Sequence, residues 1–402
     1  MSFSKKIPPE SAMWRKFNSF LQFGLEFDTS SAVDQALEYF SKSVIGLRTR
    51  WTETAIESGM NEIQIHKLPR HFDLLQDAAK YTFQHFTPNF SDAVGSIAYN
   101  DRQVVLNVAH LASDGGYFRF LIENFGKIPK NLPPFKVENE DAFKDLIDKS
   151  PTDVKGNLID ENLTRVFSHD EKNINHLEYD QYLTKYWKPS DFKFDYNPKT
   201  RAPQKLTEKT YLANFFAACA QERHLMNSFG MNTVVDLRKW LSVPVNFDHL
   251  SMIAFISPYI KNVTPDMNLS QFAQIMRKSL NDKLARHEQF GIFHSPQNGK
   301  IIPGNYFEIS NIGPIKIKKP ITNLWISMEM KAYERYTIAN MGFSVDDGQQ
   351  NNLVTRFRWN PHTLSPDEAR RMEAVVNHVI GNVSFDRTIG DVYEEAKEVY
   401  KQ

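Results

Sequence analysis

The sequence predicts an α+β protein made of two similar-sized halves, each a mixture of strands and helices. Apolar residues alternate with a period of two, or recur with a helical period, in the first 125 residues and again after residue 205. Between these regions, residues 126–205 contain seven of the 20 prolines, many charges and only short apolar clusters. We therefore expect an N-terminal half at 1–125, a variable crossover or lid at 126–205, and a C-terminal half at 206–402.

The N-terminal half starts with a strand and a helix. Apolar and polar residues alternate over 21–27, which predicts a half-buried strand. A helix is expected to follow, because Ser31 and Asp34 have the spacing of an N-terminal cap and apolar residues then share one face. The same patterns predict three further elements, a helix over about 74–86 and two strands at 94–99 and 103–109 that flank an Asn100-Asp101 turn as a hairpin.

The C-terminal half is expected to contain strands and helices in similar proportion. The patterns predict a helix over about 209–226, then a strand that ends in TVVDLR (233–238), a second strand around 252–256, and a helix from about Ser270. After this helix they predict strand-like runs at 306–313 and 323–330 and a strand pair around the Asp347-Gly348 turn. A final helix has Ser365 as its N-cap, Pro366 at its first position and Glu368 at its third, with Gly381 just past its end.

Composition excludes several classes of protein. The 48 basic and 48 acidic side chains cancel, so no global field attracts nucleic acid or an anionic membrane. Cys219 is the only cysteine, which rules out internal disulfides and cysteine-based zinc sites and fits a reducing cytosol. No run of about 18 apolar residues is present, and the start lacks the apolar segment of a signal peptide. A cytoplasmic protein without a membrane span is expected.

A histidine stands at the junction between a buried strand and a helix. Residues 107–116 read NVAHLASDGG, after an apolar run and before a helical apolar pattern. His110 is thus held on a rigid element, and an imidazole has a pKa suited to a general base near neutral pH. It can take the proton of a hydroxyl, thiol or amine that attacks a carbonyl. The simpler alternative is a loop histidine followed by an ordinary Asp-Gly turn.

The residues after His110 are expected to shape the loop. In such a tight turn Asp114 accepts backbone N–H bonds and pairs with an arginine. Gly115 and Gly116 permit backbone angles and a close approach of substrate that side chains would block. His-x-x-x-Asp alone is a weak signal, and the following glycine together with the strand-to-helix context makes it more specific.

The stretch AHLASDGG resembles the HxxxDG active-site motif of the chloramphenicol acetyltransferase-like superfamily. This superfamily includes alcohol acetyltransferases, BAHD acyltransferases, polyketide-associated acyltransferases and the condensation domains of nonribosomal peptide synthetases. Three more stretches are similar to family segments in the same order, namely IGLRTRW (45–51) after the first long helix, VDLRKWL (235–241) as the D/N-x-R strand, and ISNIG (309–313) as the S-N-x-G strand. The resemblance covers about residues 15–385.

The resemblance implies two halves of one topology that meet at a central channel, with donor and acceptor entering from opposite faces. His110 would be the general base for direct attack on a thioester, without a covalent acyl-enzyme. Asp114 would be structural, and Arg238 is its expected ion-pair partner; the alternative for Arg238 is a surface charge on a strand. Ser310 and Asn311 would donate hydrogen bonds to the oxyanion or contact substrate, although polar strand residues are more often structural.

Departures from the family pattern narrow the expectation. Position 109 is alanine, where condensation domains usually have a second histidine, so peptide condensation is disfavoured. No DFGWG motif is present, and NMGFSVDDG (340–348) is only a loose counterpart, which disfavours a plant BAHD enzyme. The alcohol acetyltransferase branch fits best.

Other candidates have simpler explanations. Lys316, Lys318 and Lys319 would contact CoA phosphates, or are edge-strand charges that block aggregation. Tyr117 and Trp325 would line the channel, or belong to the core. His169 and His176 lack metal-ligand spacing, so no metal is expected.

The expected function is transfer of an acyl group from acyl-CoA, as a co-substrate, to a small alcohol or amine. No bound cofactor is expected. Two alternatives remain: an enzyme that uses an acyl carrier protein thioester, and a non-catalytic module that binds a small molecule or a protein.

Overall fold

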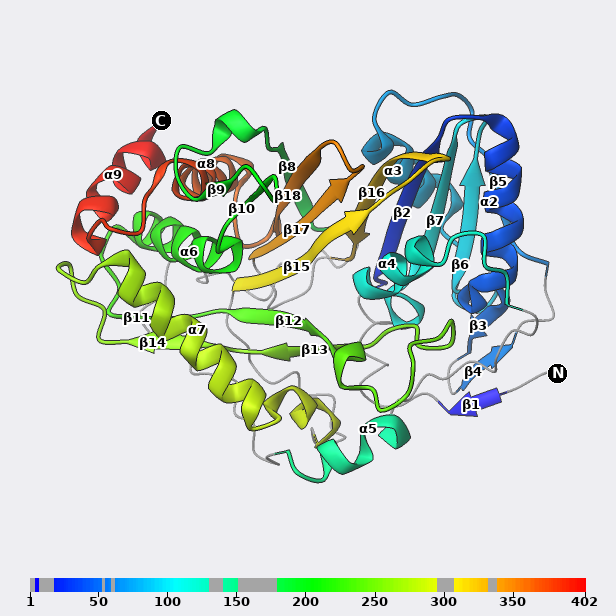
Figure 1. The fold of residues 1–402 in the computed structure, drawn as a ribbon, viewed down its shortest axis with the longest axis horizontal. Helices are drawn as coiled ribbons and strands as arrows, with labels where there is room; N and C mark the ends of the chain where they lie inside the picture. Colours follow the sequence, from blue (N-terminus) through cyan, green and yellow to red (C-terminus); the bar gives the residue numbers. More distant parts are fainter. Residues whose placement is uncertain are drawn as a thin grey trace.

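The computed structural model describes residues 4–6, 18–52, 55–58, 62–129, 140–150, 179–294, 307–331 and 338–402. Two large mixed sheets lie side by side, each with helices packed against it (Figure 1). This arrangement confirms the α+β prediction of two mixed-sheet halves. In the described residues, no helix is both long enough and apolar enough to cross a lipid bilayer.

The N-terminal half is built on a five-stranded sheet. In spatial order its strands are β16 (Ile321–Glu329), β2 (Phe20–Phe27), β7 (Gln103–Ala109), β6 (Gly95–Tyr99) and β5 (Ile65–Lys67). β5 is parallel to β6, and the other neighbours are antiparallel. β6 and β7 form the predicted hairpin.

The C-terminal half is built on a six-stranded sheet. Its strands, in spatial order, are β13 (Ile253–Ile256), β12 (Asn232–Asp236), β15 (Phe307–Lys316), β17 (Ile338–Asp346), β18 (Asn351–Trp359) and β8 (Gln181–Tyr186). β15 runs parallel to both β12 and β17, and the remaining pairs are antiparallel.

Helices and short strands complete the described structure. The α-helices are α2 (Ser30–Ser43), α3 (Leu75–Phe86), α4 (Gly115–Glu123), α5 (Glu140–Ile147), α6 (Leu206–Glu222), α7 (Leu269–Ala285), α8 (Pro366–Asn382) and α9 (Ile389–Lys401). Three small sheets are formed by β1 (Ser4–Lys6), β4 (Ala55–Ser58) and β3 (Thr49–Trp51), by β9 (Tyr196–Asn197) and β10 (Ala202–Pro203), and by β11 (Ser228–Gly230) and β14 (Tyr259–Lys261).

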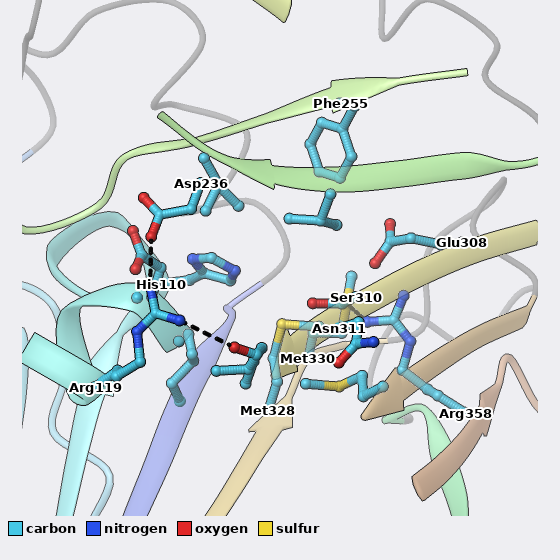
Figure 2. A pocket seen from close by; sticks show the side chains of 18 residues that line it. His110, Arg119, Asp236, Phe255, Glu308, Ser310, Asn311, Met328, Met330 and Arg358 are labelled. Carbon is cyan, nitrogen blue, oxygen red and sulfur yellow. Dashed lines mark hydrogen bonds and ion pairs between the residues drawn. The ribbon is translucent and has the colours of Figure 1, made fainter. Parts of the chain in front are cut away.

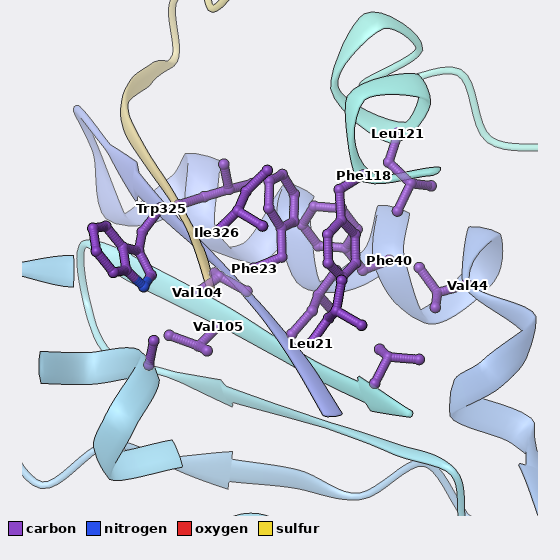
Figure 3. Close-up of a cluster of buried hydrophobic side chains, with 14 of the residues drawn as sticks. Leu21, Phe23, Phe40, Val44, Val104, Val105, Phe118, Leu121, Trp325 and Ile326 are labelled. Atoms are coloured by element: carbon purple, nitrogen blue, oxygen red, sulfur yellow. The ribbon is translucent and has the colours of Figure 1, made fainter. Parts of the chain in front are cut away.

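Sheet membership crosses the boundaries expected at residues 125 and 205. β16, from the C-terminal range, pairs along its whole length with β2 of the N-terminal sheet. Trp325 and Ile326 of β16 accordingly pack into the N-terminal core with Phe23 and Val104 (Figure 3). β8, from the expected crossover, is the edge strand of the C-terminal sheet. The two halves are therefore joined by an exchanged strand as well as by the chain.

Both faces of β2 are covered, so this strand is more buried than its alternating pattern predicts. Phe23 stacks on Phe118 of α4, with ring centroids 4.6 Å apart. On the opposite face, a Cβ built on Gly24 would lie 3.6 Å from Leu75 at the start of α3. The polar position Gln22 is fully buried, and its Nε2 donates to Asn107 Oδ1 at 2.8 Å, which satisfies the amide away from water.

Helix ends follow the predictions at some positions and differ at others. Ser365 caps α8 and forms the predicted capping box with Glu368. Thr29, rather than Ser31, caps α2 through a bond from the Ala32 amide. Gly381 lies inside α8 and does not end it, because the last turn packs against the chain at Asp191, whose carbonyl oxygen would be 2.5 Å from a Cβ at this position. α8 is also not the final helix, since α9 follows it.

Candidate active site

A cavity of about 180 Å³ lies between the two halves. One wall is formed by His110 at the end of β7 and by the start of α4. The opposite wall is the face of the C-terminal sheet that carries Val234, Glu308 and Ser310. Met328 of β16 and Met330, which directly follows this strand, close the side (Figure 2). The cavity therefore draws residues from both sheets and from the exchanged strand.

A backbone hydrogen bond holds His110 at the cavity, and burial lowers the proton affinity of its imidazole. Its amide donates to Ser19 O at 2.9 Å, and the residue is only 6% exposed. Burial lowers the pKa of His110, and the nearby Arg358 charge lowers it too, whereas Asp114 and hydrogen bonds with the backbone of His110 and Ser113 oppose the shift. The lowered pKa favours the neutral form of the ring, which is the form that a general base needs.

The loop after His110 is fixed to the strand it leaves. Ser113 Oγ donates to the carbonyls of Val108 at 3.2 Å and Ala109 at 3.1 Å. Asp114 then caps α4 by accepting the Tyr117 amide at 2.7 Å. These bonds fix the turn of the chain from β7 into α4, and with it the position of His110.

Asp114 forms a two-pronged ion pair with Arg238, the partner expected for it. Arg238 Nη1 lies 2.9 Å from Asp114 Oδ1, and Nη2 lies 3.0 Å from Oδ2. Both side chains are buried, at 6% and 2% exposure. Arg238 also donates to Asp236 Oδ1 at 3.0 Å, to His249 O at 2.8 Å and to Leu250 O. The network attaches the loop of the N-terminal half to the C-terminal half, and the alternative of a surface charge at Arg238 is wrong.

Gly115 and Gly116 are required by packing, which corrects the expectation of unusual backbone angles. Both are ordinary first-turn residues of α4, and neither has a positive φ. A Cβ on Gly116 would lie 2.4 Å from Asp236 Oδ2 and 2.6 Å from Arg238 Nη1. A Cβ on Gly115 would lie 2.6 Å from the end of the Ile312 side chain. The glycines let the helix approach the ion pair and β15.

Ser310 and Asn311 both line the cavity, beside a bulge in β15. The register between β15 and β17 shifts between Asn311 and Gly313, and Asn311 Oδ1 accepts the Gly313 amide at 3.0 Å. This bond stabilises the turn of the bulge and leaves the Asn311 amide nitrogen as a donor.

Four further ionisable residues line the cavity and were not predicted from the sequence as site residues: Arg119, Asp236, Glu308 and Arg358. Arg119 Nη1 donates to Ile312 O at 3.4 Å and Nη2 lies 3.7 Å from Asp236 Oδ2. The available signal for Glu308 is a carboxylate within the otherwise apolar start of the YFEIS run. Arg119 and Arg358 carry no local signal that separates them from surface charges.

The remaining candidates lie away from His110. Tyr117 is in the core, where its hydroxyl donates to Ser43 O at 3.4 Å. Lys316, Lys318 and Lys319 are exposed and do not line the cavity. His169 and His176 fall outside the described residues. Within the described part of the chain, no group of three or more His, Cys, Asp or Glu residues is placed to hold a metal ion.

A second cavity, of about 1000 Å³, lies on the other side of β16. Because strand residues alternate in direction, Met328 and Met330 face the His110 cavity, while Ser327 and Glu329 face the second one. Trp325 also borders the second cavity, although its ring is almost completely buried.

The sequence by itself matches no protein-family model and no curated protein. Solved structures do match. The epimerization domain from the third module of tyrocidine synthetase B superposes with a TM-score of 0.62 at 10% identity, over 99% of this chain and 98% of that one. The chain has the chloramphenicol acetyltransferase-like fold.

Two further structures with this fold are informative. The starter condensation domain of rhizomide synthetase, solved in complex with C8-CoA, gives a TM-score of 0.63 at 10% identity over 97% of each chain. The trichothecene 15-O-acetyltransferase of Fusarium sporotrichioides gives 0.60 at 12% identity, over 94% of this chain and 95% of that one. The chloramphenicol acetyltransferase-like fold thus spans the whole chain, and the alcohol acetyltransferase branch is suggested by the second of these structures only.

Proposed function

We propose that this protein is an acyltransferase that moves an acyl group from a thioester to an alcohol or amine acceptor, with His110 as the general base. The observation that carries the proposal is a buried imidazole at the wall of a cavity between the halves, with its loop fixed by the Asp114–Arg238 ion pair and its pKa lowered by burial. Such rigid placement is what general-base catalysis requires, because the base must meet the acceptor proton within hydrogen-bond distance.

The proposed reaction is a single direct transfer. His110 takes the hydroxyl proton as the acceptor oxygen attacks the thioester carbonyl, giving a tetrahedral oxyanion. Ser310 and Asn311 line the same cavity and are our candidates for the donors that stabilise this oxyanion. When the carbon–sulfur bond breaks, the thiolate takes the proton from the imidazolium, so the products are ester and free thiol and His110 returns to its neutral form.

We propose acyl-CoA as the donor. The support is the structurally similar starter condensation domain that was solved with C8-CoA. A carrier-protein thioester is the second candidate, because the similar proteins include domains of peptide synthetases.

The test is release of free thiol by the purified protein, given a panel of acyl-CoAs and pooled alcohols and amines. Release should require an acceptor and should fall roughly 10²–10⁴-fold in His110→Ala. His71→Ala, which removes an exposed histidine, is the matched control and should retain full activity. A folded His110→Ala protein with wild-type turnover would contradict the mechanism. If no thiol is released from acyl-CoA but a loaded carrier protein is turned over, the carrier-protein thioester is the donor. If neither donor is turned over, a non-catalytic binding module is favoured.

A further inference from the structure

Glu308 is a buried carboxyl group at the cavity, opposite His110. It is 7% exposed and lines the same cavity as the histidine. Figure 2 shows the two side chains on opposite sides of the cavity, with Phe255 and Ser310 near the glutamate. Among the described residues, Glu308 makes no hydrogen bond and no ion pair, although burying a carboxylate without a partner is costly.

The cations around the cavity are already engaged with other carboxylates. Arg238 pairs with Asp114 and Asp236, and Arg119 also lies near Asp236. Arg358 Nε lies 3.4 Å from Asp180 Oδ2, and its Nη1 donates to the sulfur of Met330 at 2.8 Å.

Two buried carboxyls, Asp180 and Glu308, lie near Arg358 at this end of the cavity. Among the described residues, no other guanidinium is shared by these two carboxyls. Burial raises the pKa of both carboxyls, and Arg358 opposes the shift in each case. Because burial raises the pKa of Asp180 to about 8, Asp180 keeps its proton near neutral pH, and Glu308 is left as the second carboxyl beside Arg358, without a direct bond to it.

Strand register places Arg358 two strands away from Glu308. Glu308 of β15 pairs in register with Ala339 of β17, which pairs with Arg358 of β18. Two strand spacings separate the backbones of Glu308 and Arg358 by about 10 Å. The Arg358 charge lowers the pKa of Glu308, but no direct ion pair joins the two side chains in the described structure.

We propose that the Glu308 end of the cavity binds the cationic group of an amine-bearing acceptor, and that Glu308 thereby selects amino alcohols or diamines over neutral alcohols. The ammonium gives Glu308 the direct ion pair that it does not make with any described residue. The aromatic ring of Phe255 is a further favourable neighbour for a cation. This inference deepens the proposed function, on which it rests.

The size of the cavity limits the acceptor. An apolar cavity of about 150 Å³ is large enough to bind benzene, so about 180 Å³ suits a compact molecule. A short amino alcohol is compact enough for this volume, with its hydroxyl toward His110 and its ammonium toward Glu308 on the opposite side.

The experiment compares matched acceptors in the thiol-release assay, with acetyl-CoA as donor. The probes are ethanolamine against 1-propanol, 3-aminopropan-1-ol against 1-butanol, and choline against 3,3-dimethylbutan-1-ol. Choline is decisive within this set because its nitrogen cannot be acylated, so a preference for it reports recognition of charge. We expect the wild type to favour the cationic member in kcat/KM by roughly 10- to 100-fold, mainly through KM, and Glu308→Gln to lose this preference.

Glu373→Gln on α8 is the control, because it removes a charge from a partly buried glutamate outside the cavity. It should keep the wild-type preference. Thermal unfolding of each variant verifies folding, and Glu308→Gln should fold because it replaces a buried carboxyl, which has no direct partner among the described residues, with a neutral group of similar size. Equal use of cationic and neutral acceptors by the wild type, or a preference that survives in Glu308→Gln, would overturn the proposal.

Calorimetric titration of the same probes separates this inference from the proposed function. If no acceptor is turned over, binding of choline but not of its neutral analogue, lost in Glu308→Gln, would still support the cation site while the transferase proposal fails. Absence of both turnover and cation-selective binding would overturn the cation site.

Discussion

The two ends of the cavity carry buried charge in different surroundings. At the end beside the HxxxDG loop, Arg238 has two carboxylates and two backbone carbonyls as partners, all held by short bonds. At the other end, Asp180 and Glu308 share the charge of Arg358, and Glu308 makes no direct bond among the described residues. A network of several paired charges holds a shape, whereas a buried carboxyl without a direct partner leaves free energy that a cationic ligand can recover. This difference suggests that the first end positions His110 and the second recognises substrate.

The largest expected effect comes from breaking the paired end. Asp114→Ala leaves Arg238 buried with one carboxylate fewer and also removes the cap of α4. Its free energy of unfolding should fall by about 3–5 kcal/mol in urea denaturation. Glu123→Ala, in the same helix but 60% exposed, should change it by less than about 0.5 kcal/mol. A loss at Asp114 as small as that of the control would mean that the network does not hold the two halves together.

A smaller effect is expected from crowding the same network. In Gly116→Ala the new methyl group meets Asp236 and Arg238, which are locked by their mutual bonds, so stability should fall by about 1–3 kcal/mol. Gly115→Ala meets the side chain of Ile312 alone, which is only partly buried and is not held by ion pairs, and should cost less. Thermal melts of the two variants test this ranking, and the reverse order would show that the ion pair yields more easily than the β15 bulge.

The smallest effect, with the opposite sign, is expected at the Glu308 end of the cavity. The pKa of Glu308 is raised in the folded protein, so the folded state keeps a proton that the unfolded state loses as pH rises above the ordinary glutamate value near 4.5. The wild type should therefore lose stability relative to Glu308→Gln as pH increases through that range. The difference grows by about 1.4 kcal/mol per unit of pH until the folded pKa is reached. Melting curves from pH 4 to 8 measure this difference in stability, and a difference that is constant with pH would show that folding does not raise the pKa of Glu308.

Local patterns in the sequence predict the elements better than their assembly. The capping box of α8 and the hairpin of β6 and β7 depend on neighbouring residues, and both are present. The alternation over residues 323–330 predicts a strand but cannot choose its sheet, because pairing depends on a distant edge, and β16 joins the N-terminal half. Gly381 was misread because a helix end and a close packing contact both select glycine.

The site shows the same limit. His110 and Asp114 were found because they lie four residues apart in a recognisable loop, and Arg238 through the family resemblance. Glu308, Arg358 and Asp180 come from three separate segments that meet only through the register of β15, β17 and β18. Nothing in their local sequence says that they share one cavity.

The most direct test of the central claim is the pH dependence of kcat/KM for thiol release with a neutral acceptor. Because burial lowers the pKa of His110, the neutral base persists below the ordinary histidine value of 6.5. We predict an acid limb with an apparent pKa below 6.5 that remains in Glu308→Gln and is absent from the residual activity of His110→Ala. An acid limb that is unchanged in His110→Ala would contradict the account, because the titrating base would then be another group.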